Sequence, residues 1–340
     1  IVDMHADTLL WDRDLNEWSI RGHVDVPRLQ EGNVAIQVFS SVSKTPKGQN
    51  YKSNSADSDN IRLLSMVQGQ PIRTWNSPLQ RSLYHAEKLQ KAAKKSDGTL
   101  HLIHDRGELA DFLTARQMKP NIVGAIFSVE GLHNLEGDFK NVAKLHKAGM
   151  RMAGFTHFFD NELAGSMHGE KKGGLTKFGV QVFDELERTG VIVDIAHASP
   201  KAVDDMLKRA TKPVVSSHGG VQATCKENRN LSDDQIRGVA ATGGVIGIGF
   251  WEGAVCDTST KAIADAIDHV VKIGGIETVA LGSDFDGAVT VGLEASQMDY
   301  LTNELLKRGY TPAELDLIMG GNTIRVFNDV LPEGSSKHSH

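Results

Sequence analysis

Short apolar segments rich in Val and Ile alternate with helical patterns along most of this chain, and that alternation limits its possible folds more than any other feature. Each segment has the length of a strand, and the stretches between them carry apolar residues at helical spacing. Near-continuous apolar strands are typical of a parallel sheet that helices cover on its faces. The sequence predicts strands at residues 1–5, 34–40, 122–130, 150–157, 191–197, 213–218, 244–250 and 278–284.

Helices are predicted between and after these strands, at residues 59–68, 78–95, 138–147, 178–188, 200–208, 232–241, 260–273, 298–308, 312–320 and 323–331. Eight strands that alternate with helices match a (β/α)8 barrel, which commonly spans about 250 residues and grows by insertion. A doubly wound open sheet is the alternative, but no G-x-G-x-x-G motif follows the first strand. We therefore expect an α/β fold, a (β/α)8 TIM-type barrel.

The length of 340 residues exceeds that of a minimal barrel, and residues 41–121, after the second strand, hold most of the excess. This segment reads as a polar loop and two helices, which we interpret as a lid or a dimer element and not as a second domain. We expect one barrel domain over residues 1–332. Residues 333–340 are polar and predicted to be a disordered tail, and the two histidines in it are left out of the candidate site.

Charge and cysteine content exclude several classes of protein. The formal net charge of −6 gives no sign of the basic face that nucleic-acid binding requires. No apolar run approaches the ~20 residues of a membrane-spanning helix. Two cysteines, Cys225 and Cys256, are too few for a cysteine-based zinc site or a dense disulfide scaffold. They form either one bridge, which would close a loop of about 30 residues, or two unpaired thiols, and their spacing alone does not decide.

Histidine and carboxylate residues gather where the predicted strands end. The carboxyl ends of the strands of such a barrel meet at one rim, which holds the active site. Six of the eight predicted strands bring such residues there: Asp3, His5 and Asp7; Glu130; His157; Asp194 and His197; His218; Asp284 and Asp286. Burying so many charged groups without partners would be unfavourable. A shared metal centre explains the arrangement best.

Imidazoles and carboxylates without thiolates suit Zn²⁺, Mn²⁺ or Co²⁺ better than Ca²⁺ or Mg²⁺. His5 and Asp7 are two residues apart on a strand, so they point to the same face and can bind one ion. His197 and His218 end neighbouring strands and can bind a second ion, with Glu130 bridging the two. Ions about 3.5–4 Å apart would hold a hydroxide between them for attack at neutral pH.

Each of these residues also has a structural interpretation: a buried hydrogen-bonded pair for His5 and Asp7, a buried salt bridge for Glu130, and satisfied core histidines for His197 and His218. Asp3 and Asp194 are expected to support ligands and not to bind metal themselves. Asp284 and Asp286 are hard to separate, since the second fits a turn equally well. The other histidines are assigned to surface or helix faces, with His168 the foremost exception: His23, His85, His101, His104, His133, His146, His168 and His269.

With this set assembled, nearly the whole chain resembles the membrane (renal-type) dipeptidases, the M19 metallopeptidases of the amidohydrolase superfamily. The matching stretches run from Asp3-Met-His-Ala-Asp7 to Gly320-Gly-Asn-Thr-Ile-Arg-Val326, and they include residues 23–29, 128–132, 151–157, 194–197, 217–218, 228–231 and 282–287. Related enzymes bridge their metals with a carboxylated lysine at the end of the fourth strand, where this chain has His157.

The resemblance implies two zinc ions per chain, with Mn²⁺ or Co²⁺ as possible substitutes. The implied metal ligands are His5 and Asp7 for one ion, His197 and His218 for the other, and Glu130 between them. It further implies that Asp284 is the catalytic acid and base, that His157 donates to the oxyanion, and that Arg229 pairs with the carboxylate of the substrate.

The implied function is a zinc-dependent dipeptidase that hydrolyses L-Xaa-L/D-Xaa dipeptides by a metal-bridging hydroxide. A related amidohydrolase acting on N-acyl amino acids or other small amides is the alternative. The resemblance also implies a homodimer and a possible membrane anchor outside this chain. A periplasmic or anchored extracytoplasmic location is favoured, partly because the first residue is not Met, and a cytoplasmic enzyme is the alternative.

Three local features bear on how far the resemblance extends. Residues 250–252 read Phe-Trp-Glu where the animal enzymes have a tyrosine near the substrate, so side-chain preference cannot be transferred through that position. The loop at residues 161–176 looks particular to this chain and is expected to shape the pocket. Cys225 and Cys256 match a disulfide pair of the animal enzymes, and the resemblance therefore favours the bridge.

Overall fold

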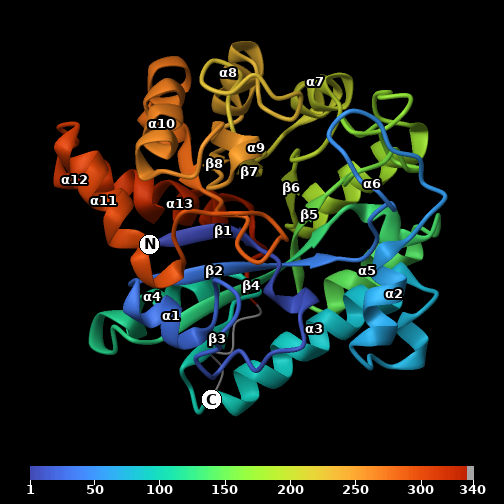
Figure 1. The fold of residues 1–340 in the computed structure, drawn as a ribbon, viewed down its shortest axis with the longest axis horizontal. Helices are drawn as coiled ribbons and strands as arrows, with labels where there is room; N and C mark the ends of the chain where they lie inside the picture. The colour runs from blue at the N-terminus through green and yellow to red at the C-terminus, as the bar shows by residue number, and fades with distance from the viewer. Residues whose placement is uncertain (335–340) are drawn as a thin grey trace.

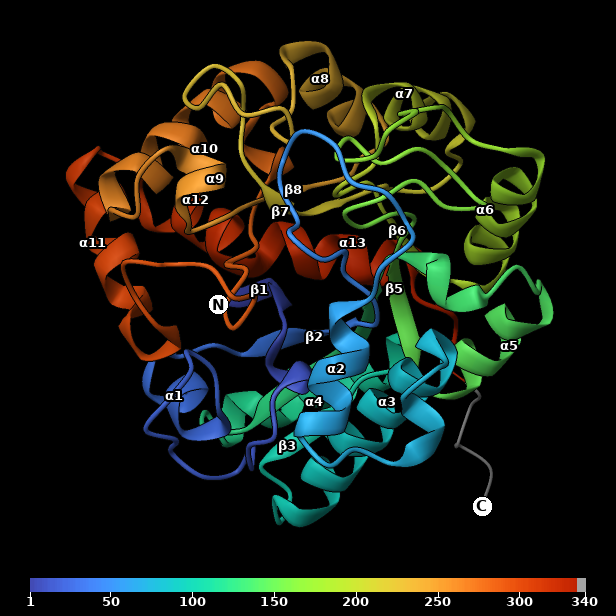
Figure 2. The same ribbon diagram turned by 45° about the vertical axis from the view of Figure 1, so that its right-hand side comes forward.

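The computed structural model describes residues 1–334 and contains a nearly closed barrel of parallel strands with helices around it (Figures 1 and 2). Eight strands follow one another in the order β6-β5-β4-β2-β1-β9-β8-β7. The ninth strand, β3, pairs with the first three residues of β4. A bridge between Asp194 and Val215 joins the two ends of this order. The strands are β1 Val2–Ala6, β2 Ile36–Val42, β3 Leu100–Leu102, β4 Val123–Glu130, β5 Met150–Gly154, β6 Ile192–Asp194, β7 Ser216–Gly219, β8 Ile246–Ile248 and β9 Val279–Leu281.

Helices surround the barrel, and many of them begin at a residue whose side chain caps the first turn. Ser77, Ser199 and Thr311 each accept a hydrogen bond from a backbone N–H of the first turn, and a proline follows each of them. The helices are α1 Val26–Glu31, α2 Asn60–Val67, α3 Pro78–Lys95, α4 Arg106–Met118, α5 Lys140–Lys147, α6 Lys177–Thr189, α7 Pro200–Arg209, α8 Asp233–Ala241, α9 Glu252–Val255, α10 Thr260–Gly274, α11 Met298–Lys307, α12 Pro312–Asp316 and α13 Asn322–Val330.

The predicted barrel is confirmed, and every predicted strand has a counterpart in it. Several strands end earlier than the sequence suggested, because the chain leaves the sheet before it reaches the polar residues. β5 ends at Gly154 and β6 at Asp194, so His157 and His197 lie on the irregular segments that follow. Nearly all strand residues are buried, which agrees with their apolar sequences.

The segment between β2 and β4 is more structured than predicted. It contains α4 and β3 in addition to the two expected helices, α2 and α3. α4 was missed because it buries only Leu109 and Phe112 and shows a weak amphipathic pattern. The short helices α1 and α9 were also missed. No helix within residues 1–334 is long and apolar enough to span a membrane. Most of the predicted tail, residues 335–340, lies outside the described residues.

Cys225 and Cys256 form a disulfide, which decides between the two alternatives that their spacing left open. The two cysteines are 31 residues apart, and the loop that they close contains Arg229 and Trp251. Both of these residues are buried beside the mouth of the barrel.

Reducing this disulfide, or replacing both cysteines with serine, is expected to lower the free energy of unfolding by roughly 3–4 kcal/mol, because the open chain regains the entropy of a loop of this length. Denaturant unfolding with and without reductant measures the change. A loss below ~1 kcal/mol would contradict the expectation, and reductant should leave the double-serine variant unaffected.

Candidate metal centre

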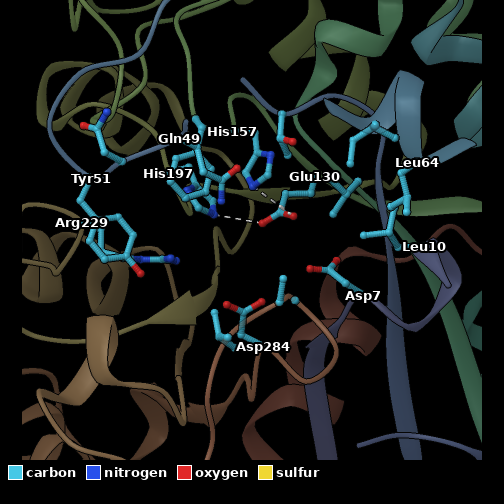
Figure 3. A pocket seen from close by; sticks show the side chains of 18 of the residues that line it. Asp7, Leu10, Gln49, Tyr51, Leu64, Glu130, His157, His197, Arg229 and Asp284 are labelled. Carbon is cyan, nitrogen blue, oxygen red and sulfur yellow. Dashed lines mark hydrogen bonds and ion pairs between the residues drawn. The ribbon is translucent and has the colours of Figure 1, made fainter. Parts of the chain in front are cut away.

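Imidazole and carboxylate groups from separate parts of the chain converge at the carboxyl ends of the barrel strands (Figure 3). Three overlapping groups have ligand atoms within 4.8 Å of one another, and every member is buried: His5, Glu130 and His218; Glu130, His157 and His197; His5, Asp7 and Asp284. The structure therefore brings together all the residues predicted as metal ligands, and His157 and Asp284 with them.

Glu130 occupies the middle of this cluster. Its Oε1 atom lies 3.0 Å from Nε2 of His197, 3.2 Å from Nε2 of His218 and 3.6 Å from Nε2 of His5. Its Oε2 atom faces Nε2 of His157 at 3.5 Å. One carboxylate thus reaches the imidazoles of four segments, which is the position a bridging ligand needs.

Two more carboxylates, Asp7 and Asp284, approach the same nitrogen of His5 as Glu130 does. Nε2 of His5 is 3.4 Å from Oδ1 of Asp7 and 3.8 Å from Oδ1 of Asp284. Nε2 of His197 and Nε2 of His218 are 3.1 Å apart. The cluster therefore has two sides, one around His5 and Asp7 and one around His197 and His218, with Glu130 between them.

The spacing of these atoms fits a divalent cation. Ligands 2.0–2.1 Å from a tetrahedral zinc ion lie about 3.3 Å from one another, and the separations around Glu130 are 3.0–3.6 Å. Several buried atoms here have no hydrogen-bond partner among the described residues, namely both ring nitrogens of His5, Oδ1 of Asp7 and Oε2 of Glu130. Buried polar atoms rarely lack partners. The donor set thus fits metal ions that bind through nitrogen and oxygen.

The pKa shifts show how strongly the carboxylates favour positive charge nearby. Burial by itself would lower the pKa of His5, but the charges of Glu130 and Asp7 raise it to about 10. Burial and the charge of Glu130 raise the pKa of Asp7 to about 6. Burial and the charge of Asp7 raise the pKa of Asp284 well above its usual range. Burial would raise the pKa of Glu130 too, but neighbouring imidazoles bring it well below its usual range.

Two buried aspartates hold the segments that carry these groups. Asp3 accepts hydrogen bonds from the backbone N–H and the hydroxyl of Ser283, at 2.8 and 2.7 Å, and so fixes the residue before Asp284. Asp194 accepts from the hydroxyl of Ser217, whose oxygen lies 2.8 Å from Nδ1 of His218. The serine oxygen therefore accepts a hydrogen bond from the Nδ1–H of His218, and Nε2 of His218 is free to bind a cation. Both aspartates have the supporting position that the sequence predicted.

The backbone is strained where two of the site residues project. His197 and Asp284 are in the left-handed region, with φ of +63° and +61°, where residues other than glycine are uncommon. Close packing sets the second of these turns. A Cβ atom at Gly282 would lie 1.8 Å from the carbonyl oxygen of Ser217, so only glycine lets this segment approach β7.

Arg229 lies beside the cluster and carries a positive charge that the described residues leave without a carboxylate partner. Its guanidinium group stacks 4.5 Å from the centre of the Trp251 ring and donates to the carbonyl of His218 at 3.3 Å. The Trp251 indole N–H in turn donates to the hydroxyl of Tyr51 at 3.0 Å. Arg229 is 5% exposed and lines a cavity of about 570 Å³ together with Glu130, His157, His197 and Asp284. A buried, oriented guanidinium suits a carboxylate ligand.

The structure separates Asp284 from Asp286. Asp284 lines the cavity, whereas Asp286 accepts hydrogen bonds from Thr8, Arg13 and the backbone of His23, at 2.8, 2.5 and 2.7 Å. Asp286 therefore fixes the turn after β9 against the N-terminal segment, which agrees with its predicted alternative role as a turn residue.

Three of the remaining histidines, which were assigned to surface or helix faces with His168 as the expected exception, are buried in the structure. His85 on α3 is fully buried and bonds to Ser41, and His133 is buried and bonds to Ser43. His168, the expected exception, is fully buried and stacks on Phe158 with 4.7 Å between the ring centres. Its ring centre lies 5.3 Å from that of His197. All three belong to polar contacts that only the folded chain brings together.

Six of the 19 residues of the described chain that line the cavity come from the segment after β2, and none comes from the loop at residues 161–176, which was expected to shape it. The six are Thr45, Gln49, Asn50, Tyr51, Ile61 and Leu64. The interpretation of the insertion as a lid fits this arrangement. No motif marked the individual lining residues, since they lie in a polar loop and on one helix.

The similarities to known proteins agree with this geometry. The model of the membrane dipeptidase family, peptidase family M19, matches residues 1–338. Dipeptidase aclJ of Aspergillus oryzae is 28% identical over 354 residues, which cover 97% of this chain and 78% of that protein.

Solved structures share the fold. A Rhodobacter sphaeroides metallopeptidase bound to a phosphinate mimic of the dipeptide L-Ala-D-Ala is 20% identical, with a TM-score of 0.77 over 97% of this chain and 99% of that one. The probable dipeptidase PvdM of Pseudomonas aeruginosa is 19% identical, with a TM-score of 0.79 over 97% and 94% of the two chains.

Proposed function

The chain belongs to the membrane dipeptidase family of metallopeptidases, M19, and on that premise we propose that it is a zinc-dependent enzyme that hydrolyses dipeptides of the type L-Xaa-L/D-Xaa. The observation that carries the proposal is the convergence of buried imidazoles and carboxylates beside the guanidinium of Arg229, which has no carboxylate partner within residues 1–334. A cavity of about 570 Å³ is the size of a small-molecule site. An anchor for a free carboxylate next to a metal centre suits a short peptide.

Two zinc ions per chain are proposed, with Mn²⁺ or Co²⁺ as substitutes. His5 and Asp7 would hold one ion, His197 and His218 the other, and Glu130 would bridge them. When bound, such a pair supplies an activated water and polarises the scissile carbonyl. The separations around Glu130 and the unpaired buried ligand atoms support this assignment.

The residues of the chain have distinct tasks in this proposal. Arg229 binds the terminal carboxylate and so fixes the position of the scissile bond. Asp284 lines the cavity next to His5, where it takes up the proton of the attacking water and delivers it to the leaving amine. His157 donates to the carbonyl oxygen as negative charge develops there.

A substrate panel tests the proposal. With zinc present, dipeptides should be hydrolysed faster than their N-acetylated counterparts and faster than N-acyl amino acids. Faster turnover of N-acyl amino acids would instead support the alternative amidohydrolase. Metal analysis of the folded protein should give about two ions per chain, and a count of one or none would contradict the proposed centre.

Arg229→Ala should raise KM for dipeptides and lower kcat/KM by about 10–150-fold, since charge-assisted hydrogen bonds contribute about 1.5–3 kcal/mol. Arg229→Lys should recover only part of the loss, because an ammonium group lacks the planar fork of a guanidinium. Comparing each dipeptide with its C-terminal amide isolates the contact. An amide that loses as much as the free acid would contradict the assignment.

An extracytoplasmic location, periplasmic or membrane-anchored, is proposed as well. The Cys225–Cys256 disulfide supports it, because such bonds persist in oxidising compartments and are rare in the cytosol. Labelling by a thiol reagent in intact cells, before and after reduction, would test whether the bond is formed in the native compartment.

A further inference from the structure

The cavity over the candidate metal centre has two chemically different ends (Figure 3). Arg229 and Tyr51 lie at one end, and Leu10 and Leu64 lie at the other, with Glu130 between them. The Arg229 end is therefore cationic and polar, and the Leu10 end is apolar apart from the carboxylate of Asp7, which lies between Leu10 and the centre of the cluster.

The apolar end is built by segments that are distant in the sequence. Its walls are Leu10, Trp11, Val42, Ile61 and Leu64, from the turn after β1, the end of β2 and the helix α2. Leu10, Val42 and Ile61 form one small apolar cluster, and Trp11 and Leu64 pack against it. Leu10, Val42 and Ile61 are at most 6% exposed, whereas Trp11 and Leu64 are half-buried and face the cavity.

Polar atoms in this wall are engaged within the protein. The Trp11 indole N–H donates to the carbonyl of Asp286 at 2.7 Å. The carbonyl of Leu10 accepts from the side chain of Gln68 at 3.0 Å, and that of Trp11 accepts from Nζ of Lys88 at 2.6 Å. A charged or hydrogen-bonding side chain packed against these five walls would lose water and gain little in return.

The direction of a bound dipeptide follows from the opposite end. With its carboxylate at Arg229 and its scissile carbonyl over Glu130, the residue on the amino side of the bond faces the apolar walls. We propose that this apolar end is the binding site for the side chain of the substrate's amino-terminal residue, and that the enzyme prefers large apolar residues there. The proposal rests on the proposed dipeptidase function and adds the substrate class to it.

Residues of the inserted segment set this preference in the proposal. Ile61 and Leu64 belong to α2, within the long segment between β2 and β4. In an apolar pocket one methylene group changes kcat/KM by about 10-fold or more. Leu-Ala and Phe-Ala should therefore exceed Gly-Ala by at least about 10-fold, and Asp-Ala and Lys-Ala should not exceed Gly-Ala.

The test measures kcat/KM for these five dipeptides at saturating zinc. Hydrolysis of all five at similar rates, or a preference for Asp-Ala or Lys-Ala, overturns the inference and leaves the dipeptidase proposal intact. Failure to hydrolyse any of the five, in protein that retains its metal, contradicts the proposed function itself.

Two substitutions at Leu64, one polar and one bulkier, test whether the apolar walls determine the preference for the amino-terminal residue. Leu64→Asn makes the end polar, and it should reduce the ratio of Leu-Ala to Gly-Ala by about 10-fold. Leu64→Trp fills the space, and it should disfavour Phe-Ala more than Gly-Ala. Leu63→Asn is the matched control, because Leu63 neighbours Leu64 on α2 but is 63% exposed and outside the cavity lining.

The control should keep the wild-type ratios. Thermal unfolding of all three variants separates a change in preference from a loss of folding. Unchanged ratios in both Leu64 variants, with melting temperatures near that of the wild type, would overturn the proposal.

Discussion

Asp284→Asn is expected to lower kcat for dipeptides by about 10²–10⁴-fold, the usual contribution of a positioned general acid and base. An amide of the same shape cannot take up and release the proton. The zinc content should change little, because the substitution leaves His5, Asp7 and Glu130 in place. Steady-state kinetics with metal analysis of the same sample measures both quantities.

Asp286→Asn is the matched control for Asp284→Asn. Asp286 lies two residues away and is buried as well, but its partners are Thr8, Arg13 and the backbone of His23. Its substitution should reduce stability by about 1–3 kcal/mol per unsatisfied buried donor and should reduce kcat less than Asp284→Asn does. Equal loss of kcat in both variants would contradict the assigned roles.

Removing metal with a chelator should abolish hydrolysis and destabilise the fold at once. Ligand bound only to the native state adds about 4 kcal/mol at a free concentration 1,000 times Kd, and each occupied site contributes separately. The carboxylates of Asp7, Glu130 and Asp284 lie around His5, and burial together with the neighbouring carboxylates raises the pKa of Asp7 and of Asp284. Without cations their mutual repulsion opposes folding.

Thermal unfolding and activity measured before chelation, after chelation and after adding zinc test this result. Zinc should restore both quantities, and Mn²⁺ or Co²⁺ should restore them in part. A chelated protein that keeps its melting temperature and its activity would show that the cluster is an ordinary network of buried polar groups.

The barrel and its polar rim could be predicted from the sequence because both depend on short-range patterns. A strand such as β4 is apolar throughout, and the residue at its end, Glu130, is read directly from that pattern. The topology of a parallel barrel then brings all such ends to one rim. The proximity of His5, Glu130 and His218, which lie on strands, thus required no knowledge of loop conformations, whereas His197 lies on the irregular segment after β6.

The cavity wall could not be predicted in this way. Tyr51 and Leu64 reach the site through the path of a long insertion, which depends on tertiary contacts. His168 and His133 are similar cases, since nothing near them in the sequence indicates that they become buried beside Phe158 and Phe159. Their positions follow from packing between distant segments, which propensity and periodicity do not describe.

The left-handed backbone at His197 and Asp284 lowers the stability of the folded chain at the residues that the site requires. Glycine adopts that conformation without steric conflict, whereas other residues are held there by their surroundings. Glycine at either position would relieve the backbone but would also remove a buried side chain that the site requires, so it offers no route to a more stable catalyst. Engineers seeking a robust catalyst should leave these two turns untouched and look for gains on the outer helices.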